Sequence, residues 1–171
     1  MNFLKRYIDF ADKFISTTGR AVAWLTTVLV LVVCYDVFTR YFLKSSSVAV
    51  QEMEWHLFAL IFLLGAAYTL KTENHVRVDV FYSKLSERGK AWVNLFGTLL
   101  FLIPFCLMLI YASKNFVINS FNIGETSPDP GGLPGRYILK SIIPIAFFLL
   151  LIQSISLMFK SILTIAARKN K

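Results

Sequence analysis

Four long apolar segments follow one another along the chain, at about residues 19–43, 48–70, 91–111 and 137–159. Each is long enough to cross the roughly 30 Å hydrocarbon core of a bilayer as an α-helix. One such segment could be a buried helix of a soluble protein, but four of them in 171 residues leave little chain for anything else. The sequence therefore predicts an all-α integral membrane protein, with one domain built as a bundle of four transmembrane helices.

The composition favours the same class. Hydrophobic residues make up 56% of the chain and charged residues 16%, whereas about 25% of a typical soluble domain is charged. The net charge of +8 could suggest a nucleic-acid partner. The basic residues, however, lie in short segments between and outside the apolar blocks, where they determine membrane topology. We therefore expect the lipid bilayer, and not nucleic acid, as the surrounding partner.

Two shorter segments have the pattern of helices that lie in the membrane interface. In residues 3–16 the apolar side chains fall on one helical stripe, and the charged side chains, Asp12 among them, fall on the other side. Residues 78–85 have a shorter version of the same pattern. An ordinary amphipathic helix packed against the bundle would give the same pattern, so both interpretations stay open.

The distribution of Lys and Arg predicts the orientation. The two ends of the chain and the connection between the second and third spans carry 13 of the 18 basic residues. The positive-inside rule then places both termini in the cytoplasm. Residues 122–135 face outward, and their three prolines and four glycines predict a loop without a regular element.

The polar residues form no recognisable catalytic or metal-binding pattern. Cys34 and Cys106 each lie inside an apolar segment and form no CxxC pair. His56 and His75 would be about 28 Å apart along a helix, so they cannot share a haem iron. The sequence has no Walker-type loop, zinc pattern or internal repeat of the kind that complete carriers contain. We therefore expect a protein that is not an enzyme, carries no cofactor and supports another protein.

Four stretches carry a more specific signal. They are VFTRYFL (37–43), QEMEW (51–55), GAAYTLKTENHVRVDVF (65–81) and GETSPDPGGLPGRYILKSIIPIAF (124–147). In this order they resemble the small, four-helix membrane subunit of tripartite ATP-independent periplasmic (TRAP) transporters, the DctQ type. The resemblance extends from about residue 15 to residue 165. Many members have two adjacent glutamates at the start of the second helix, whereas Glu52 and Glu54 are separated here by Met53.

The resemblance implies a system of three proteins in a bacterial or archaeal inner membrane. A periplasmic binding protein captures an organic anion, and a large multi-span subunit transports it together with sodium. The small subunit enlarges the static scaffold of this elevator-type carrier and holds no substrate, metal or catalytic residue. The alternative is a stand-alone homo-oligomeric membrane protein, or the anchor subunit of another membrane complex.

The resemblance and the topology together suggest candidate contact residues. Those expected to contact the large subunit, unless they form local salt bridges, are Asp36, Arg40, Glu52, Glu54 and Gln153. Those expected to contact the binding protein, unless the loop is simply solvated, are Glu125, Asp129, Arg136 and Lys140. Those expected to fix the inner connection to the membrane surface are His75, Arg77 and Asp79, of which Asp79 could be only a helix cap. Gln153 and Ser156 are expected to hydrogen-bond to a neighbouring helix.

Overall fold

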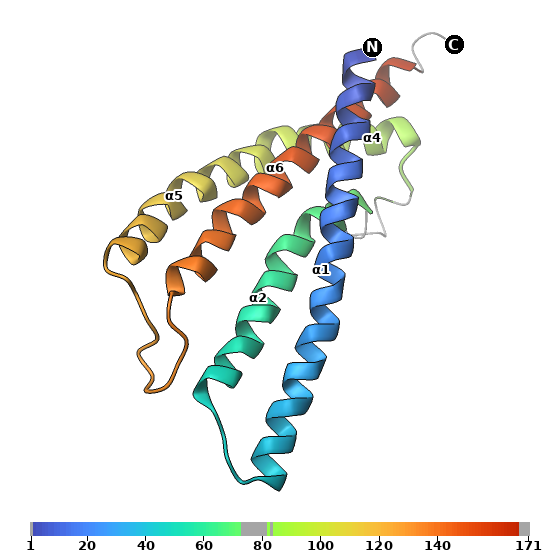
Figure 1. Cartoon of the computed structure of the whole chain (residues 1–171). Helices are drawn as coiled ribbons and strands as arrows, with labels where there is room; N and C mark the ends of the chain where they lie inside the picture. The colour runs from blue at the N-terminus through green and yellow to red at the C-terminus, as the bar shows by residue number, and fades with distance from the viewer. Residues whose placement is uncertain (1, 73–81, 83, 168–171) are drawn as a thin grey trace.

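The computed structural model describes residues 2–72, 82 and 84–167 (Figure 1). The helices in this part of the chain are α1 (Asn2–Phe42), α2 (Val48–Lys71), α4 (Glu87–Gly97), the π-helical turn η1 (Thr98–Leu102), α5 (Ile103–Asn122) and α6 (Arg136–Ala167). Helices α4, η1 and α5 follow one another without a break. Four helical segments are long and apolar enough to cross a membrane. The all-α class with four membrane-spanning helices is therefore confirmed.

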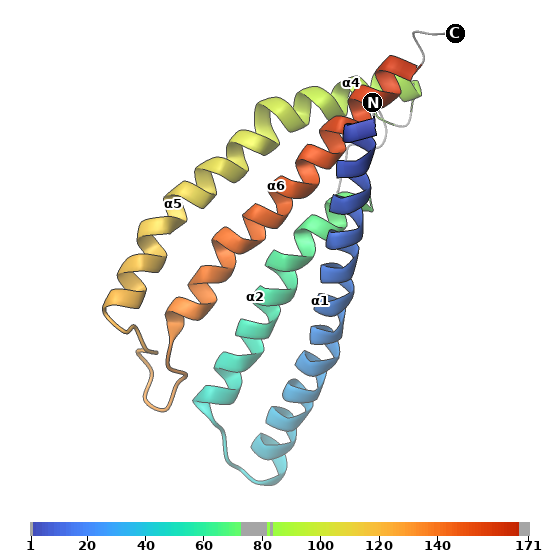
Figure 2. The same cartoon turned by 45° about the horizontal axis from the view of Figure 1, so that its top comes forward.

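The four long helices form an open layer and not a closed bundle. In the order α5, α6, α2, α1 they lie side by side, closest together near the chain termini and diverging toward the two loops at the opposite end (Figure 2). Helix α6 packs against α5, α2 and α4, and α1 packs against α2 and α6. This layer differs from the bundle expected from the sequence, because hydrophobic periodicity identifies a buried face without identifying its neighbour.

Helix α6 is the central member of the layer. In its most apolar stretch 39% of the residues are buried inside the chain, compared with 11% in α1. The buried apolar core is made by Ile15, Ala67, Leu70, Cys106, Leu149, Leu150 and Leu157. Many other large apolar side chains are exposed and are therefore available to lipid or to a protein partner.

The structure differs from the expectation at residues 3–16, which are the first turns of α1 and not a separate helix. The Ser-Thr-Thr-Gly sequence that follows looks like a break. However, the hydroxyl groups of Thr17 and Thr18 bond to backbone carbonyls one turn earlier, at 3.0 and 3.1 Å. A Cβ atom at Gly19 would lie 2.4 Å from the Tyr68 ring, so glycine permits close packing of α1 on α2. Helix α1 therefore continues for 41 residues.

The third helix continues beyond the predicted span, and it is curved. The span was predicted at residues 91–111, and helical structure extends from Glu87 to Asn122 and bends along its length (Figure 1). The wide turn η1 lies directly before Pro104, whose ring would clash with the carbonyl group four residues earlier in a regular α-helix. The π turn therefore accommodates the proline without breaking the helix. Residues 78–85 lie mostly outside the described residues.

Candidate partner surfaces and the polar contacts beneath them

The carboxylate of Glu52 holds the loop between α5 and α6, the outer loop (122–135), against α2. The residue is 4% exposed. Its Oε1 atom accepts a hydrogen bond from the Ser127 hydroxyl at 2.5 Å, and its Oε2 atom accepts one from the backbone N–H of Leu133 at 2.6 Å. The guanidinium group of Arg136 lies 3.5 Å from Oε1. One side chain of α2 therefore binds both arms of the outer loop.

The outer loop has a defined shape although it contains no regular element. Its two arms are joined by backbone hydrogen bonds from Ser127 N–H to Leu133 C=O at 3.1 Å and from Arg136 N–H to Glu125 C=O at 2.9 Å. Gly132 packs so tightly that a Cβ atom there would lie 2.4 Å from the Ser127 Oγ atom. The prediction of an irregular loop is correct, but the loop is a compact hairpin.

A second ion pair fixes the base of the outer loop. The Lys140 ammonium group bonds to the Glu125 carboxylate and also lies 4.1 Å from the centre of the Phe116 ring. The hydrogen bond from Lys140 lowers the pKa of Glu125 below its ordinary value, because it stabilises the ionised carboxylate. Of the four residues expected to contact a binding protein, three therefore bond within the chain. Asp129 is exposed at the loop tip.

Near the chain termini, Asp12 joins α1 to α6. Its Oδ1 atom accepts hydrogen bonds from Gln153 Nε2 at 3.2 Å and Ser156 Oγ at 3.1 Å, and its Oδ2 atom accepts one from Lys160 Nζ at 2.6 Å. The Tyr7 hydroxyl donates to a carbonyl oxygen of α6 at 3.2 Å. Gln153 and Ser156 thus bond to a neighbouring helix as predicted, and that helix belongs to the same chain.

Sequence reasoning placed Asp12 on the polar side of residues 3–16 and missed its contact with α6. A signal was present in the sequence. Gln153, Ser156 and Lys160 are spaced by three and four residues, so they form one polar stripe along an otherwise apolar helix. Such a stripe in a membrane helix needs a polar partner, and Asp12 is that partner.

Two other carboxylates keep an oxygen without a partner. Asp36 is 2% exposed and pairs with Arg40 on its own helix, the local salt bridge that was the alternative to a partner contact. Within the described part of the chain, Asp36 Oδ1 and Glu54 Oε1 are buried and receive no hydrogen bond. A buried acceptor without a donor costs about 1–3 kcal/mol. These two atoms are therefore places where a donor from another chain would be favourable.

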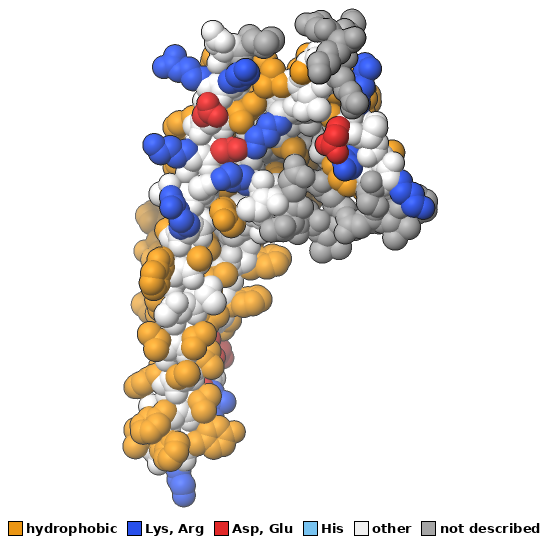
Figure 3. Space-filling model, turned by 90° about the vertical axis from the view of Figure 1, so that its right-hand side faces the viewer, with side chains coloured by type: hydrophobic (Ala, Val, Ile, Leu, Met, Phe, Trp, Pro, Cys, Tyr) orange, Lys and Arg blue, Asp and Glu red, His pale blue; other side chains and the backbone are white. Residues whose placement is uncertain are grey.

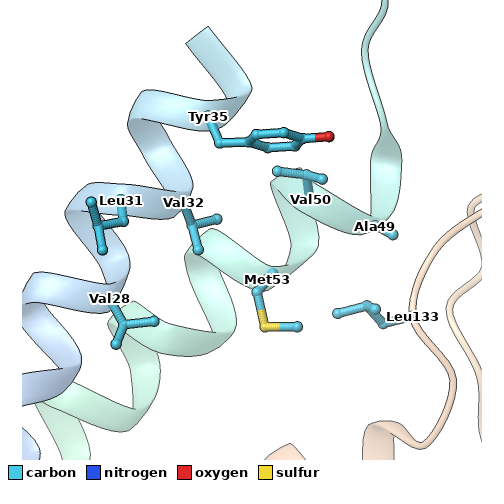
Figure 4. A pocket seen from close by; sticks show the side chains of 8 residues that line it. All are labelled: Val28, Leu31, Val32, Tyr35, Ala49, Val50, Met53 and Leu133. Carbon is cyan, nitrogen blue, oxygen red and sulfur yellow. The ribbon is translucent and has the colours of Figure 1, made fainter. Parts of the chain in front are cut away.

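An apolar groove lies between α1 and α2 beside the outer loop (Figure 4). Its volume is about 400 Å³. The side chains that line it are Val28, Leu31, Val32, Tyr35, Ala49, Val50, Met53 and Leu133. Apart from the Tyr35 hydroxyl these side chains are apolar, so the groove suits hydrocarbon and not an ion.

His56 contacts residues of its own helix. The His56 ring lies against the Trp55 ring, with centroids 4.0 Å apart, and its Nδ1 atom is 2.5 Å from the Glu52 carbonyl oxygen. His75, Arg77 and Asp79 lie outside the described residues. Among the residues that are described, no group of three or more His, Cys, Asp or Glu could hold a metal ion.

Comparison with known proteins identifies the family of the chain. A family model for the DctQ component of tripartite ATP-independent periplasmic transporters matches residues 29–164, well over half of the chain. The chain belongs to the DctQ family. The match includes Glu52, the outer loop and the Asp36–Arg40 pair, whereas Asp12 precedes it. No curated protein is similar enough to the chain to count as a match.

Family membership confirms the resemblance found in the sequence. As a DctQ component, the chain is a small membrane subunit of a TRAP transporter and a multi-pass membrane protein. Members of the family are transporter components, and the family is not an enzyme family. Membership also implies association with the large TRAP membrane subunit and with a substrate-binding protein.

Proposed function

We propose that this DctQ subunit is the static scaffold of a sodium-coupled TRAP transporter for organic anions, and that it packs against the large multi-span subunit. The observation that carries the proposal is the open layer of helices. A closed bundle would bury its inner faces, whereas the described helices form a layer with two broad faces that they do not cover themselves (Figure 2). In the proposed complex, substrate and sodium bind to the large subunit.

Apolar surface alone does not select a protein partner in a membrane, because lipid tails are equally apolar. Association there depends on close packing and on hydrogen bonds between helices. Asp36 on α1 and Glu54 on α2 each have a buried oxygen that lacks a donor in the described chain. We therefore propose that donors of the large subunit bond to these two carboxylates. Glu52 supports the fold in this proposal, because its carboxylate already bonds within the chain. Gln153 Nε2 bonds to Asp12, whereas the buried Gln153 Oε1 lacks a donor in the described chain.

The outer loop is proposed as a docking platform for the periplasmic binding protein. Glu52 and the Glu125–Lys140 pair hold the loop in one shape, which lowers the entropy cost of docking. Asp129 is exposed and is the contact residue of this proposal. The arrangement requires the loop to face the periplasm and both termini to face the cytoplasm, in agreement with the distribution of Lys and Arg.

The test combines co-purification with transport. The chain is expressed with the large membrane subunit of the same transporter, and pull-down yield and sodium-driven organic-anion uptake into proteoliposomes are measured. We expect Asp36→Asn together with Glu54→Gln to lower the yield without changing substrate preference. Glu87→Gln is the matched control, because the Glu87 side chain is 74% exposed at the opposite end of the layer.

Two results would contradict the proposal. One is a chain that is stable and monodisperse without any large subunit and whose deletion leaves sodium-dependent uptake intact, as expected of a stand-alone protein. The other is a double variant that assembles normally but prefers a different anion, which would place the substrate site on this chain.

A further inference from the structure

Helix α5 carries one charged side chain, Lys114, which is exposed. Its ammonium group forms no hydrogen bond, ion pair or ring contact with the described part of the chain. A charged group on a membrane helix is costly unless it is paired or reaches the interface. Seen from the α1 side (Figure 3), Lys and Arg side chains gather over the half of the molecule near the termini, whereas hydrophobic side chains cover the half toward the loops. Lys114 belongs to the second half, so an anion that pairs with it would come from outside the chain.

The outer loop shows how deep Lys114 lies in the membrane. An irregular loop that is exposed to lipid does not lie in the hydrocarbon core, so this loop is at or beyond the boundary with the headgroups. The Lys140 ammonium group bonds to Glu125 of the loop and lies 4.1 Å from the centre of the Phe116 ring, which places Phe116 at the same boundary. Lys114 is two residues, or about 3 Å of helix, farther from the loop. A lysine at this depth extends its ammonium group to the headgroups.

An apolar groove lies beside Lys114 along the seam between α5 and α6, and we call it the Lys114 groove. Its volume is about 450 Å³, and none of the residues that line it is acidic. Its lining includes Leu107, Ile110, Tyr111, Lys114 and Ile118 of α5, and Pro144 of α6. Leu107 and Ile110 are four to seven residues, or about 6–10 Å of helix, farther from the outer loop than Lys114. The groove is therefore cationic at the level of the headgroups and apolar toward the middle of the bilayer.

We infer that the Lys114 groove binds an anionic phospholipid of the leaflet on the outer-loop side, with a headgroup phosphate on the Lys114 ammonium group and an acyl chain along Leu107 and Ile110. A phospholipid has the same order of polarity as the groove, with negative charge at the interface and hydrocarbon below it. Because Lys114 is the charged residue of the lining, net negative lipids should bind more tightly than zwitterionic ones. Tyr111, 82% exposed, lies beside it, and tyrosine is enriched at this depth of a membrane. The inference concerns the surface of this chain and does not depend on what the transporter carries.

A lipid fits this groove better than a helix of another protein does. Membrane helices pack closely where small residues line the contact, whereas the side chains of α5 in this groove are long or branched. The groove between α1 and α2 has no charged side chain in its lining and serves as an internal comparison. Both grooves suit an acyl chain, but of the two only the Lys114 groove selects a headgroup by its charge. One cation near a membrane surface contributes about fivefold to affinity for an anionic lipid.

Lipid binding to the purified complex of the full chain with the large subunit tests the inference. The detergent-solubilised complex is titrated with phosphatidylglycerol or with phosphatidylcholine, and bound lipid is counted by native mass spectrometry. We expect tighter binding of phosphatidylglycerol, and a Kd for it about fivefold higher in Lys114→Gln. Lys114→Arg should keep the preference. The matched control is Lys44→Gln, which removes an exposed cation between α1 and α2 and should leave this Kd within about twofold of the wild type.

A second measurement locates the lipid in the reconstituted complex. A fluorophore is attached at Met108→Cys, where the native side chain is 57% exposed one residue from Leu107, or at Leu31→Cys, in the groove between α1 and α2. Both labels are placed in a Cys34→Ser background because Cys34 is exposed. Brominated phosphatidylglycerol should quench the Met108 label more strongly than brominated phosphatidylcholine at the same mole fraction, and this preference should vanish in Lys114→Gln. The Leu31 label should be quenched equally by both lipids.

Four outcomes would overturn the inference. They are equal affinity of the wild type for the two lipids, an unchanged Kd in Lys114→Gln, an equal loss in Lys44→Gln, and protection of the Met108 label from both brominated lipids. The last of these would show that a protein covers the groove. Failure of the two subunits to form a complex would contradict the proposed function instead, and the same titration would then be made on the purified full chain.

Discussion

Replacing Asp12 tests whether one carboxylate holds α1 against α6. Three donors of α6 bond to it, at 3.2, 3.1 and 2.6 Å. Two of these donors belong to Gln153 and Ser156, which are 1% and 0% exposed, so water cannot readily replace the lost acceptor. Asp12→Ala leaves both donors unpaired. Asp12→Asn keeps an acceptor for one or both of them and removes the ion pair with Lys160.

The size of the effect can be bracketed from the bonds. Hydrogen bonds between membrane helices average about 0.6 kcal/mol, so three of them give about 2 kcal/mol. Hydrogen bonds to charged groups outside the hydrocarbon contribute about 1.5–3 kcal/mol each. Because Asp12→Ala also leaves two buried donors unpaired, the upper bound of its cost is higher than about 2 kcal/mol. We therefore expect Asp12→Ala to lower the free energy of unfolding by about 2–5 kcal/mol. Asp12→Asn should cost less.

Unfolding in mixed micelles, titrated with sodium dodecyl sulfate and followed by circular dichroism, measures this free energy. Asp9→Ala is the matched control, because Asp9 is one turn earlier on the same helix and exposed. Its effect should stay within about 0.5 kcal/mol. The reasoning is refuted if the two alanine variants lose equal stability, or if Asp12→Ala is as stable as the wild type.

Three further predictions concern helix packing and the outer loop. Gly19→Ala should lower the unfolding free energy by about 1–3 kcal/mol through overpacking. Gly65→Ala should not lower it, because the space beside Gly65 is open. Equal melting curves for the two variants would contradict this prediction. Glu52→Gln should speed amide hydrogen exchange in the outer loop, because the amide cannot accept both loop donors as a carboxylate does; unchanged exchange would count against the anchor. Because the pKa of Glu125 is lowered in the folded state, its stabilising contribution is complete above the ordinary pKa of about 4.3 and is lost as pH falls through the lowered pKa. Lys140→Met should therefore speed amide hydrogen exchange in the outer loop at neutral pH and reduce the pH dependence of the stability of the loop. Equal protection of the loop from exchange in the wild type and in Lys140→Met at pH 7 would disprove this.

The sequence predicts the helices well because apolar length and polar interruptions are local properties. It correctly predicts four helices long and apolar enough to span a membrane, and Asn122 ends α5 and Arg136 begins α6 at the predicted limits of the outer loop. It cannot give the order of helices in the layer, which depends on contacts between residues far apart in the chain. Asp12 illustrates the difference, because its helical position is evident from the sequence but its partners lie more than 140 residues away.

The candidate contact residues show the same limit. Glu52 and Glu54 look equivalent in the sequence, two acids at the start of one helix. In the structure Glu52 is bonded to the outer loop, whereas Glu54 keeps an oxygen without a donor in the described chain. Two residues along a helix point about 200° apart, so one acid faces the loop and the other does not. Only the position of the loop reveals which is which.

The π turn at Thr98–Leu102 contains one residue more than the same turn of a regular α-helix would contain. Deleting a single residue there would convert it to ordinary α-helix while α4 and α5 keep nearly the same rotation relative to each other, because the π turn has already absorbed the extra residue. Ala91, 5% exposed, would then keep its small side chain against the layer. A deletion in the regular helix away from this turn has nothing to absorb it and would rotate α4 by about 100° relative to α5.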